Sequence, residues 1–197
     1  MKYISLIISI IITQLNSFSQ GQKSQHFYNS LNEVISSQQF ILDKVICDFN
    51  NDKIKDYILV VDEKKNNLEN AQHQAPLPIL IIQGVKTGFK LWKKNEHIVE
   101  DLDDNCPADG FQKIVSKLNY FTVESTVCQD NFYLTHFTTF KYSKESDNVT
   151  LHKFGIKKIN RQNPNQKYVD KIYTVKEFGR ILFEEFSIEK LKLKLKN

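Results

Sequence analysis

The chain has 197 residues, of which 41% are hydrophobic and 12% aromatic, and this is enough for one domain with a buried core. Lysine and arginine number 27 against 23 acidic residues, and these charges alternate along the chain as on an ordinary solvated surface. Because nucleic-acid binding usually needs basic residues clustered on one face, the pattern argues against nucleic acid as a partner. The composition also argues against a long disordered tail and against a bundle of membrane spans.

The N-terminus has the layout of a secretory signal peptide. Lys2 precedes an apolar run from Ile4 to Ile12, and small residues precede the expected cut after Ser19. The run is shorter than the roughly 20 residues that span a bilayer, although an uncleaved anchor is the alternative. We therefore expect a signal peptide over residues 1–19, a single mature domain over residues 20–197, a periplasmic or secreted location, and no stable membrane span after cleavage.

Apolar periodicity predicts one helix followed by many strands. Apolar residues between Phe27 and Ile35 recur at helical spacing, so an amphipathic helix is expected from Phe27 to Phe40. Lys117-Leu118-Asn119 is typical of a hairpin turn. Short runs rich in β-branched and aromatic residues predict strands over 40–47, 57–61, 79–82, 89–92, 112–118, 120–127, 132–142 and 149–159.

The C-terminal part is expected to contain one helical turn. Thr174 is its predicted N-cap, Glu177 completes a capping box, and Gly179 ends the turn. Residues 180–186 are predicted as a strand, and the alternating tail 191–196 as an edge strand or a solvated end. The predicted fold class is α+β and mainly β: an antiparallel sheet or meander with one N-terminal helix and a short helical turn near the C-terminus.

Three cysteines in an exported chain predict one disulfide and one free thiol. Cys106 lies in a turn-like stretch and Cys128 ends a strand-like run, so a bridge between these two is favoured. Cys47 follows an alternating apolar segment and is expected to be a buried free thiol. The five histidines show no spacing that would make a cysteine a catalytic nucleophile.

The segment from Asp48 to Asp56 is the one motif that indicates a specific chemistry. Oxygen-bearing side chains occupy loop positions 1, 3, 5 and 9, and the backbone carbonyl of Ile54 falls at position 7. This spacing suits a hard cation, either Ca²⁺ or, less well, Mg²⁺. Leu59 stands where an EF-hand has glutamate, and a strand is predicted to follow, so the segment is not an EF-hand. A metal-free turn stabilised by Asp and Asn side chains is the alternative.

The loop resembles that of the FG-GAP or VCBS-type repeats of integrin-like β-propellers, in which a strand enters D-x-[DN]-x-D-G-x-x-D and a second apolar strand leaves. The chain is also similar to a group of small exported bacterial proteins that carry one such loop ahead of a β-rich body. Lys53 departs from the pattern, because the family has glycine at this position, where a sharp turn needs positive φ. The resemblance implies a structural Ca²⁺ ion held by the side chains of Asp48, Asn50, Asp52 and Asp56 and by the carbonyl of Ile54.

These features favour a non-enzymatic exported protein that binds another protein or an envelope component and carries a structural Ca²⁺-type loop. A specific version is a periplasmic immunity or inhibitor protein that masks a toxin or hydrolase. The rival is a hydrolase of cell-wall or glycan material, which would use the carboxylates between Asp101 and Asp109 together with a histidine such as His136.

Overall fold

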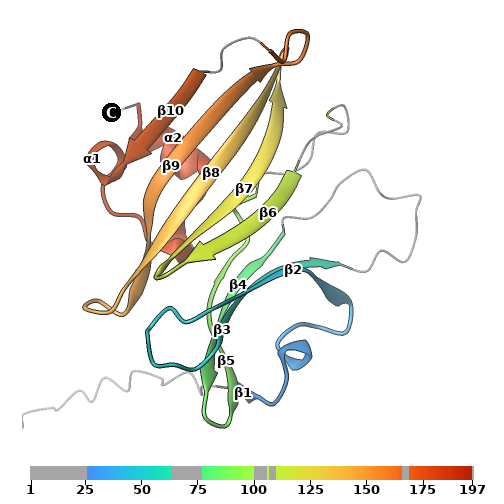
Figure 1. Cartoon of the computed structure of the whole chain (residues 1–197), viewed down its shortest axis with the longest axis vertical. Coiled ribbons are helices and arrows are strands. Elements are labelled where there is room, and N and C mark those ends of the chain that lie inside the picture. Colours follow the sequence, from blue (N-terminus) through green and yellow to red (C-terminus); the bar gives the residue numbers. More distant parts are fainter. Residues whose placement is uncertain (1–25, 64–76, 100–105, 107–109, 166–168, 197) are drawn as a thin grey trace, which may run out of the picture.

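The computed structural model describes residues 26–63, 77–99, 106, 110–165 and 169–196. The predicted signal peptide and the acidic residues Asp101 to Asp104 and Asp109 lie outside this part. The described chain contains two five-stranded antiparallel sheets (Figure 1). The mainly β architecture predicted from the sequence is therefore confirmed.

The first sheet has the strand order β1-β5-β4-β3-β2. Its central strands β3 and β4 are apolar on both faces, because each face packs against other parts of the protein. One face joins the main core, and the other is covered by the segment around Leu31 to Ile35. The strands are β1 (Phe27–Tyr28), β2 (Gln39–Cys47), β3 (Asp56–Glu63), β4 (Ile79–Val85) and β5 (Gly88–Asn95).

The amphipathic helix predicted from Phe27 to Phe40 is not present. The segment instead contains β1, which pairs with β5, and one 3-10 turn, η1 (Leu31–Glu33), before β2 begins. Side chains take up its backbone donors: Glu33 accepts a hydrogen bond from the Asn29 N–H at 2.9 Å, and Gln39 accepts one from the Ser36 N–H at 3.2 Å. Such local bonds compete with helix formation. Three of the apolar side chains that suggested a helix, Leu31, Val34 and Ile35, still pack on the first sheet.

The second sheet is a meander with the order β10-β9-β8-β7-β6. The turn between its first two strands lies at Leu118-Asn119, as predicted. A bulge between the pairs Thr139–Lys153 and Phe140–Leu151 shifts the alternation of β9, so that Leu151 and Phe154 both face the core. The strands are β6 (Gly110–Lys117), β7 (Tyr120–Gln129), β8 (Phe132–Ser143), β9 (Asn148–Asn160) and β10 (Val169–Thr174), the last of which was not predicted.

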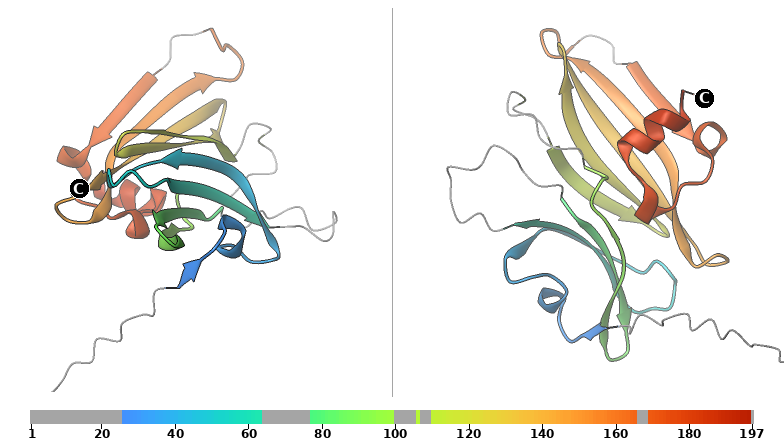
Figure 2. Two further views of the ribbon diagram at one scale, coloured as in Figure 1. Left: turned by 60° about the horizontal axis from the view of Figure 1, so that its bottom comes forward. Right: turned by 180° about the vertical axis from the view of Figure 1, so that it is seen from behind.

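Three short helical segments cover one face of the second sheet: α1 (Val175–Phe178), η3 (Phe183–Glu185) and α2 (Ile188–Lys194), as Figure 2 shows from behind. The predicted capping box is formed, with the Thr174 hydroxyl accepting from the Lys176 N–H and the Glu177 carboxylate accepting from the Thr174 N–H. The helical turn near the C-terminus is therefore confirmed.

Two predictions for the C-terminal part are wrong. Residues 180–186 form η3 and a single bridge, between Leu182 and Thr150, rather than a strand. The alternating tail forms α2, because Ser187 caps a helix on which Ile188 and Leu191 fall on one buried face. Leu193, one of the three leucines that suggested alternation, is left 65% exposed.

The main core lies between one face of the first sheet, the inner face of the second sheet and the C-terminal segments. Phe121, Phe140 and Phe183 stack or meet edge to face at its centre, with ring centroids 5.2 to 5.9 Å apart. The edge strands β2 and β6 lie side by side, and Asp43 accepts a hydrogen bond from the Ile114 N–H at 3.3 Å. No other described element covers the opposite face of the second sheet, which we call the outer face and which is turned toward the viewer in Figure 1.

Candidate functional site

The Asp48–Asp56 loop joins β2 to β3, and its first three oxygen-bearing side chains turn inward. Asp48 accepts hydrogen bonds from the backbone N–H groups of Asp52, at 3.1 Å, and Lys53, at 3.0 Å. The Asn50 side-chain oxygen accepts from the Asp52 N–H at 3.0 Å, and its amide donates to the Asp52 carboxylate at 2.8 Å. Asp52 in turn accepts from the Ile54 N–H at 2.7 Å. The loop thus brings Asp48, Asn50 and Asp52 together.

Two residues of the loop have left-handed backbone conformations. Asn51 has φ 57°, which asparagine tolerates, and Lys53 has φ 70°. Lys53 stands where the D-x-[DN]-x-D-G-x-x-D pattern has glycine. Its positive φ shows that the backbone still makes the sharp turn for which the pattern uses glycine. A lysine in this conformation has a conformational cost that glycine does not have.

Asp56 lies at the base of the loop and connects it to β4. It has no exposed surface, and its two oxygens accept hydrogen bonds from the Phe49 N–H at 2.9 Å and the Gly84 N–H at 3.0 Å. Burial raises the pKa of this carboxyl group, and the two N–H donors act against the rise. Gly84 has to be glycine, because an added Cβ would lie 2.2 Å from the Lys55 carbonyl oxygen.

The gathered side chains meet part of the requirement for Ca²⁺. Asp48, Asn50 and Asp52 converge, and each of their oxygens keeps acceptor capacity beyond the hydrogen bonds above. Asp56 differs from these three in being fully buried, where its two oxygens accept one backbone N–H each. Across the described ranges, no group of three or more His, Cys, Asp or Glu side chains is arranged to hold a metal ion. The Ca²⁺ site stays a prediction.

The cysteines pair as expected. A disulfide joins Cys106 to Cys128 and so links the segment before β6 to the end of β7. Cys47 is free and half-buried at the end of β2. Burial, together with the nearby carboxylates of Asp56 and Asp48, raises the pKa of its thiol to about 12. Cys47 is therefore protonated at neutral pH and is a poor nucleophile.

The residues named for a hydrolase cannot be joined into a site within the described part of the chain. His136 is 3% exposed on the inner face of the second sheet, where its ring lies 5.3 Å from that of Phe154. The acidic residues proposed as its partners lie outside the described ranges.

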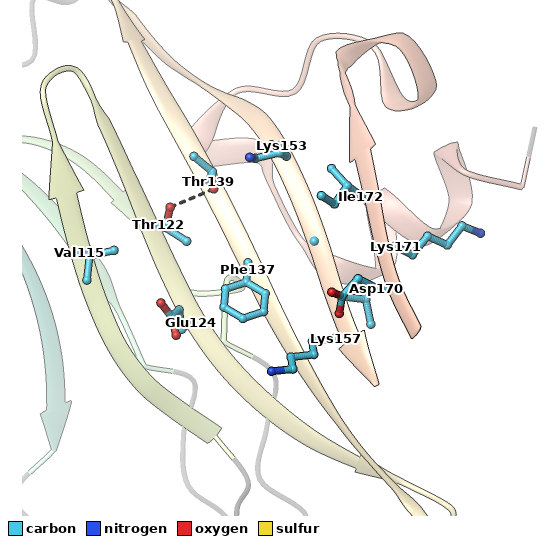
Figure 3. A pocket seen from close by; sticks show the side chains of 12 residues that line it. Val115, Thr122, Glu124, Phe137, Thr139, Lys153, Lys157, Asp170, Lys171 and Ile172 are labelled. Atoms are coloured by element: carbon cyan, nitrogen blue, oxygen red, sulfur yellow. Dashed lines mark hydrogen bonds between the residues drawn. The ribbon is translucent and has the colours of Figure 1, made fainter. Parts of the chain in front are cut away.

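Sequence reasoning did not find the groove on the outer face of the second sheet. Its volume is about 450 Å³, and it crosses strands β6 to β10. Phe137 on β8 and Gly155 on β9 form its centre, and Figure 3 shows the phenyl ring with its face turned outward. A Cβ added to Gly155 would lie 3.5 Å from the Phe137 Cβ, so the aromatic ring leans over the glycine backbone. The feature of the sequence that could have indicated this groove is the repeated threonine and lysine at alternate, outward-facing positions of β7 to β9.

Polar and basic side chains surround this centre. The Thr122 and Thr139 hydroxyl groups are 2.9 Å apart on one side of the phenyl ring. The strand register assigns to the outer face two acids, Glu124 and Asp170, and five lysines: Lys113, Lys117, Lys141, Lys153 and Lys157. Lys113 pairs with Glu124 at 3.4 Å. The outer face therefore carries an excess of positive charge.

Comparison with protein-family models, with curated proteins and with solved structures finds no match to this chain. Among the described residues, no helix is long and apolar enough to cross a membrane. The assignment of function thus depends on the chemistry of the loop and of the outer face.

Proposed function

We propose that this is an exported, non-enzymatic binding protein that recognises another macromolecule of the cell envelope through the outer face of its second sheet. The observation that supports this most directly is the groove of about 450 Å³ centred on Phe137, which no other described element covers. An aromatic floor with a few hydroxyl and charged groups around it is typical of a recognition surface. The register of the five-stranded meander places these groups side by side on one face.

A bulky substitution in the groove tests this proposal. Thr139→Tyr places a large side chain among the groove residues, whereas Thr87→Tyr adds the same side chain to the exposed β4–β5 turn of the first sheet. We expect wild type and Thr87→Tyr to co-sediment with the envelope fraction of the producing cells, and Thr139→Tyr to bind about tenfold more weakly. Absence of co-sedimentation by wild type, or equal binding by both variants, would refute the proposal.

We further propose that the Asp48–Asp56 loop holds a structural Ca²⁺ ion that stabilises the β2–β3 connection. The convergence of Asp48, Asn50 and Asp52 supports this role. The Ile54 carbonyl and the Asp56 carboxylate, which also accepts hydrogen bonds from two backbone N–H groups, would complete the ligands. A ligand that binds only the folded state raises the midpoint of thermal unfolding.

The Ca²⁺ proposal is tested by thermal unfolding with and without millimolar Ca²⁺. The midpoint of wild type should rise with Ca²⁺, and Asp52→Ala should abolish the rise. Asp62→Ala, which removes a carboxylate from β3 outside the loop, should keep it. If Ca²⁺ leaves the wild-type midpoint unchanged, the loop is the metal-free alternative.

A further inference from the structure

We propose that the outer face binds an acidic polysaccharide, a chain of sugar rings that carry carboxylate groups, with Lys153, Lys157 and Phe137 as its main contacts. This inference rests on the proposed binding function and specifies the chemistry of the partner. Three features of the groove support it: the position of its lysines, the orientation of its aromatic ring and the hydroxyl pair beside that ring.

The lysines of β9 are spaced to contact two anionic groups of one extended chain. Lys153 and Lys157 lie on the outer face on either side of Gly155, four residues apart along one strand. At about 3.3 Å per residue, their backbone positions are roughly 13 Å apart. Asp170 lies opposite Lys157 in the register, and Glu124 pairs with Lys113, so both acids of this face lie beside lysines. Lys153 is exposed. The excess positive charge complements a polyanion.

The electrostatic environment at one end of the groove agrees with this charge excess. Tyr120 and His152 meet edge to face at 5.0 Å, and the Lys141 Nζ lies 5.4 Å from the Tyr120 ring. Burial and the two nearby lysines, Lys141 and Lys153, lower the pKa of His152. Lys141 comes from β8 and Lys153 from β9, so lysines of two strands contribute the positive charge near the His152 ring.

The centre of the groove suits sugar rings better than a purely ionic partner. Phe137 is half-buried with its ring face turned outward (Figure 3), so that the apolar C–H face of a sugar can pack on it. The hydroxyl groups of Thr122 and Thr139, 2.9 Å apart, can exchange hydrogen bonds with sugar hydroxyls. A volume of about 450 Å³ falls within the range of sites for small ligands, so the groove holds a short segment of the polymer.

The test measures binding of the mature protein to polygalacturonate by titration calorimetry. Dextran serves as the neutral polysaccharide, and poly-glutamate, single-stranded DNA and phosphatidylglycerol vesicles serve as the other polyanions. We expect binding to polygalacturonate, none to dextran, and binding to the other anions that is about tenfold weaker or undetectable. Equal or tighter binding to any other polyanion would overturn the choice of partner.

Variants separate recognition from general ion exchange. Lys153→Gln/Lys157→Gln should weaken polygalacturonate binding about tenfold, whereas Lys86→Gln/Lys196→Gln, with the same loss of charge at exposed positions outside the groove, should not. Phe137→Leu keeps an apolar side chain but loses the aromatic face, and should weaken binding about threefold or more. Circular dichroism checks that each variant is folded. Unchanged affinity of Phe137→Leu, or equal losses in the two double variants, would overturn the proposal.

The same measurements separate this inference from the proposed function. If Thr139→Tyr loses envelope binding while wild type does not bind polygalacturonate, the outer face is a binding surface for a different partner. If wild type binds neither the envelope fraction nor polygalacturonate, both proposals fail.

Discussion

Replacing Lys53 with glycine is expected to stabilise the folded protein. Lys53 has φ 70°, and a left-handed conformation costs a non-glycine residue about 1–2 kcal/mol. Glycine adopts this conformation freely, but it adds conformational entropy to the unfolded chain, which costs about 0.4–1 kcal/mol. The midpoints of these two ranges differ by about 0.8 kcal/mol, which is the expected gain. The lysine side chain is exposed, so its removal leaves no cavity. For a chain of this size, the midpoint of thermal unfolding should rise by about 1–4 °C.

Lys55→Gly is the matched control for this prediction. Lys55 is also exposed and carries the same charge, but its φ is not positive, so glycine there should destabilise the protein by about 0.5–1 kcal/mol. Urea denaturation in EDTA gives the free energies of unfolding of both variants without metal. If Lys53→Gly is no more stable than Lys55→Gly, the backbone reasoning is refuted.

The Lys53→Gly variant also bears on the Ca²⁺ proposal. Removing a positive charge beside the gathered oxygens of the loop should strengthen the binding of a divalent cation. Titration with Ca²⁺ should therefore raise the thermal midpoint of Lys53→Gly at lower Ca²⁺ concentrations than that of wild type. Identical titration curves would argue that the loop oxygens do not form the site.

Three further predictions concern buried and capping groups. Asp56→Asn should lose about 1–3 kcal/mol of unfolding free energy in urea, because an amide offers one oxygen to the N–H groups of Phe49 and Gly84; a stability equal to that of wild type would contradict the anchoring role. The pKa of Glu177 is lowered by its hydrogen bonds with the N-cap residue, so its stabilising effect should be present above about pH 4.5 and be lost as the pH falls through the folded-state pKa. Glu177→Gln should remove that part of the pH dependence, measured by thermal unfolding between pH 3 and 7. With its pKa raised from 9.0 to about 12, the Cys47 thiol should react with iodoacetamide at pH 8 about a thousandfold more slowly in the folded protein than in urea, and similar rates would show that the thiol is not shielded.

Local sequence patterns were sufficient to predict those elements whose conformation is decided by residues close together in the chain. Eight of the strands were predicted near their observed places, because β-branched and aromatic runs bounded by turn residues suit a pleated, half-buried surface. The capping box of Thr174 and Glu177 was predicted for the same reason, since both partners lie within one turn. The disulfide between Cys106 and Cys128 followed from the positions of the cysteines in predicted strands and turns.

Long-range packing decided the rest. The spacing between Phe27 and Ile35 suits a helix, but pairing with β5 and packing on the first sheet hold this segment in another conformation. The tail after Ser187 alternates as a strand would, yet it becomes a helix because the core offers a place to Ile188 and Leu191. The groove at Phe137 depends on the strand register and on which face the C-terminal segments cover. A sequence states which residues are apolar or charged, whereas the face on which each one lies depends on contacts between segments far apart in the chain.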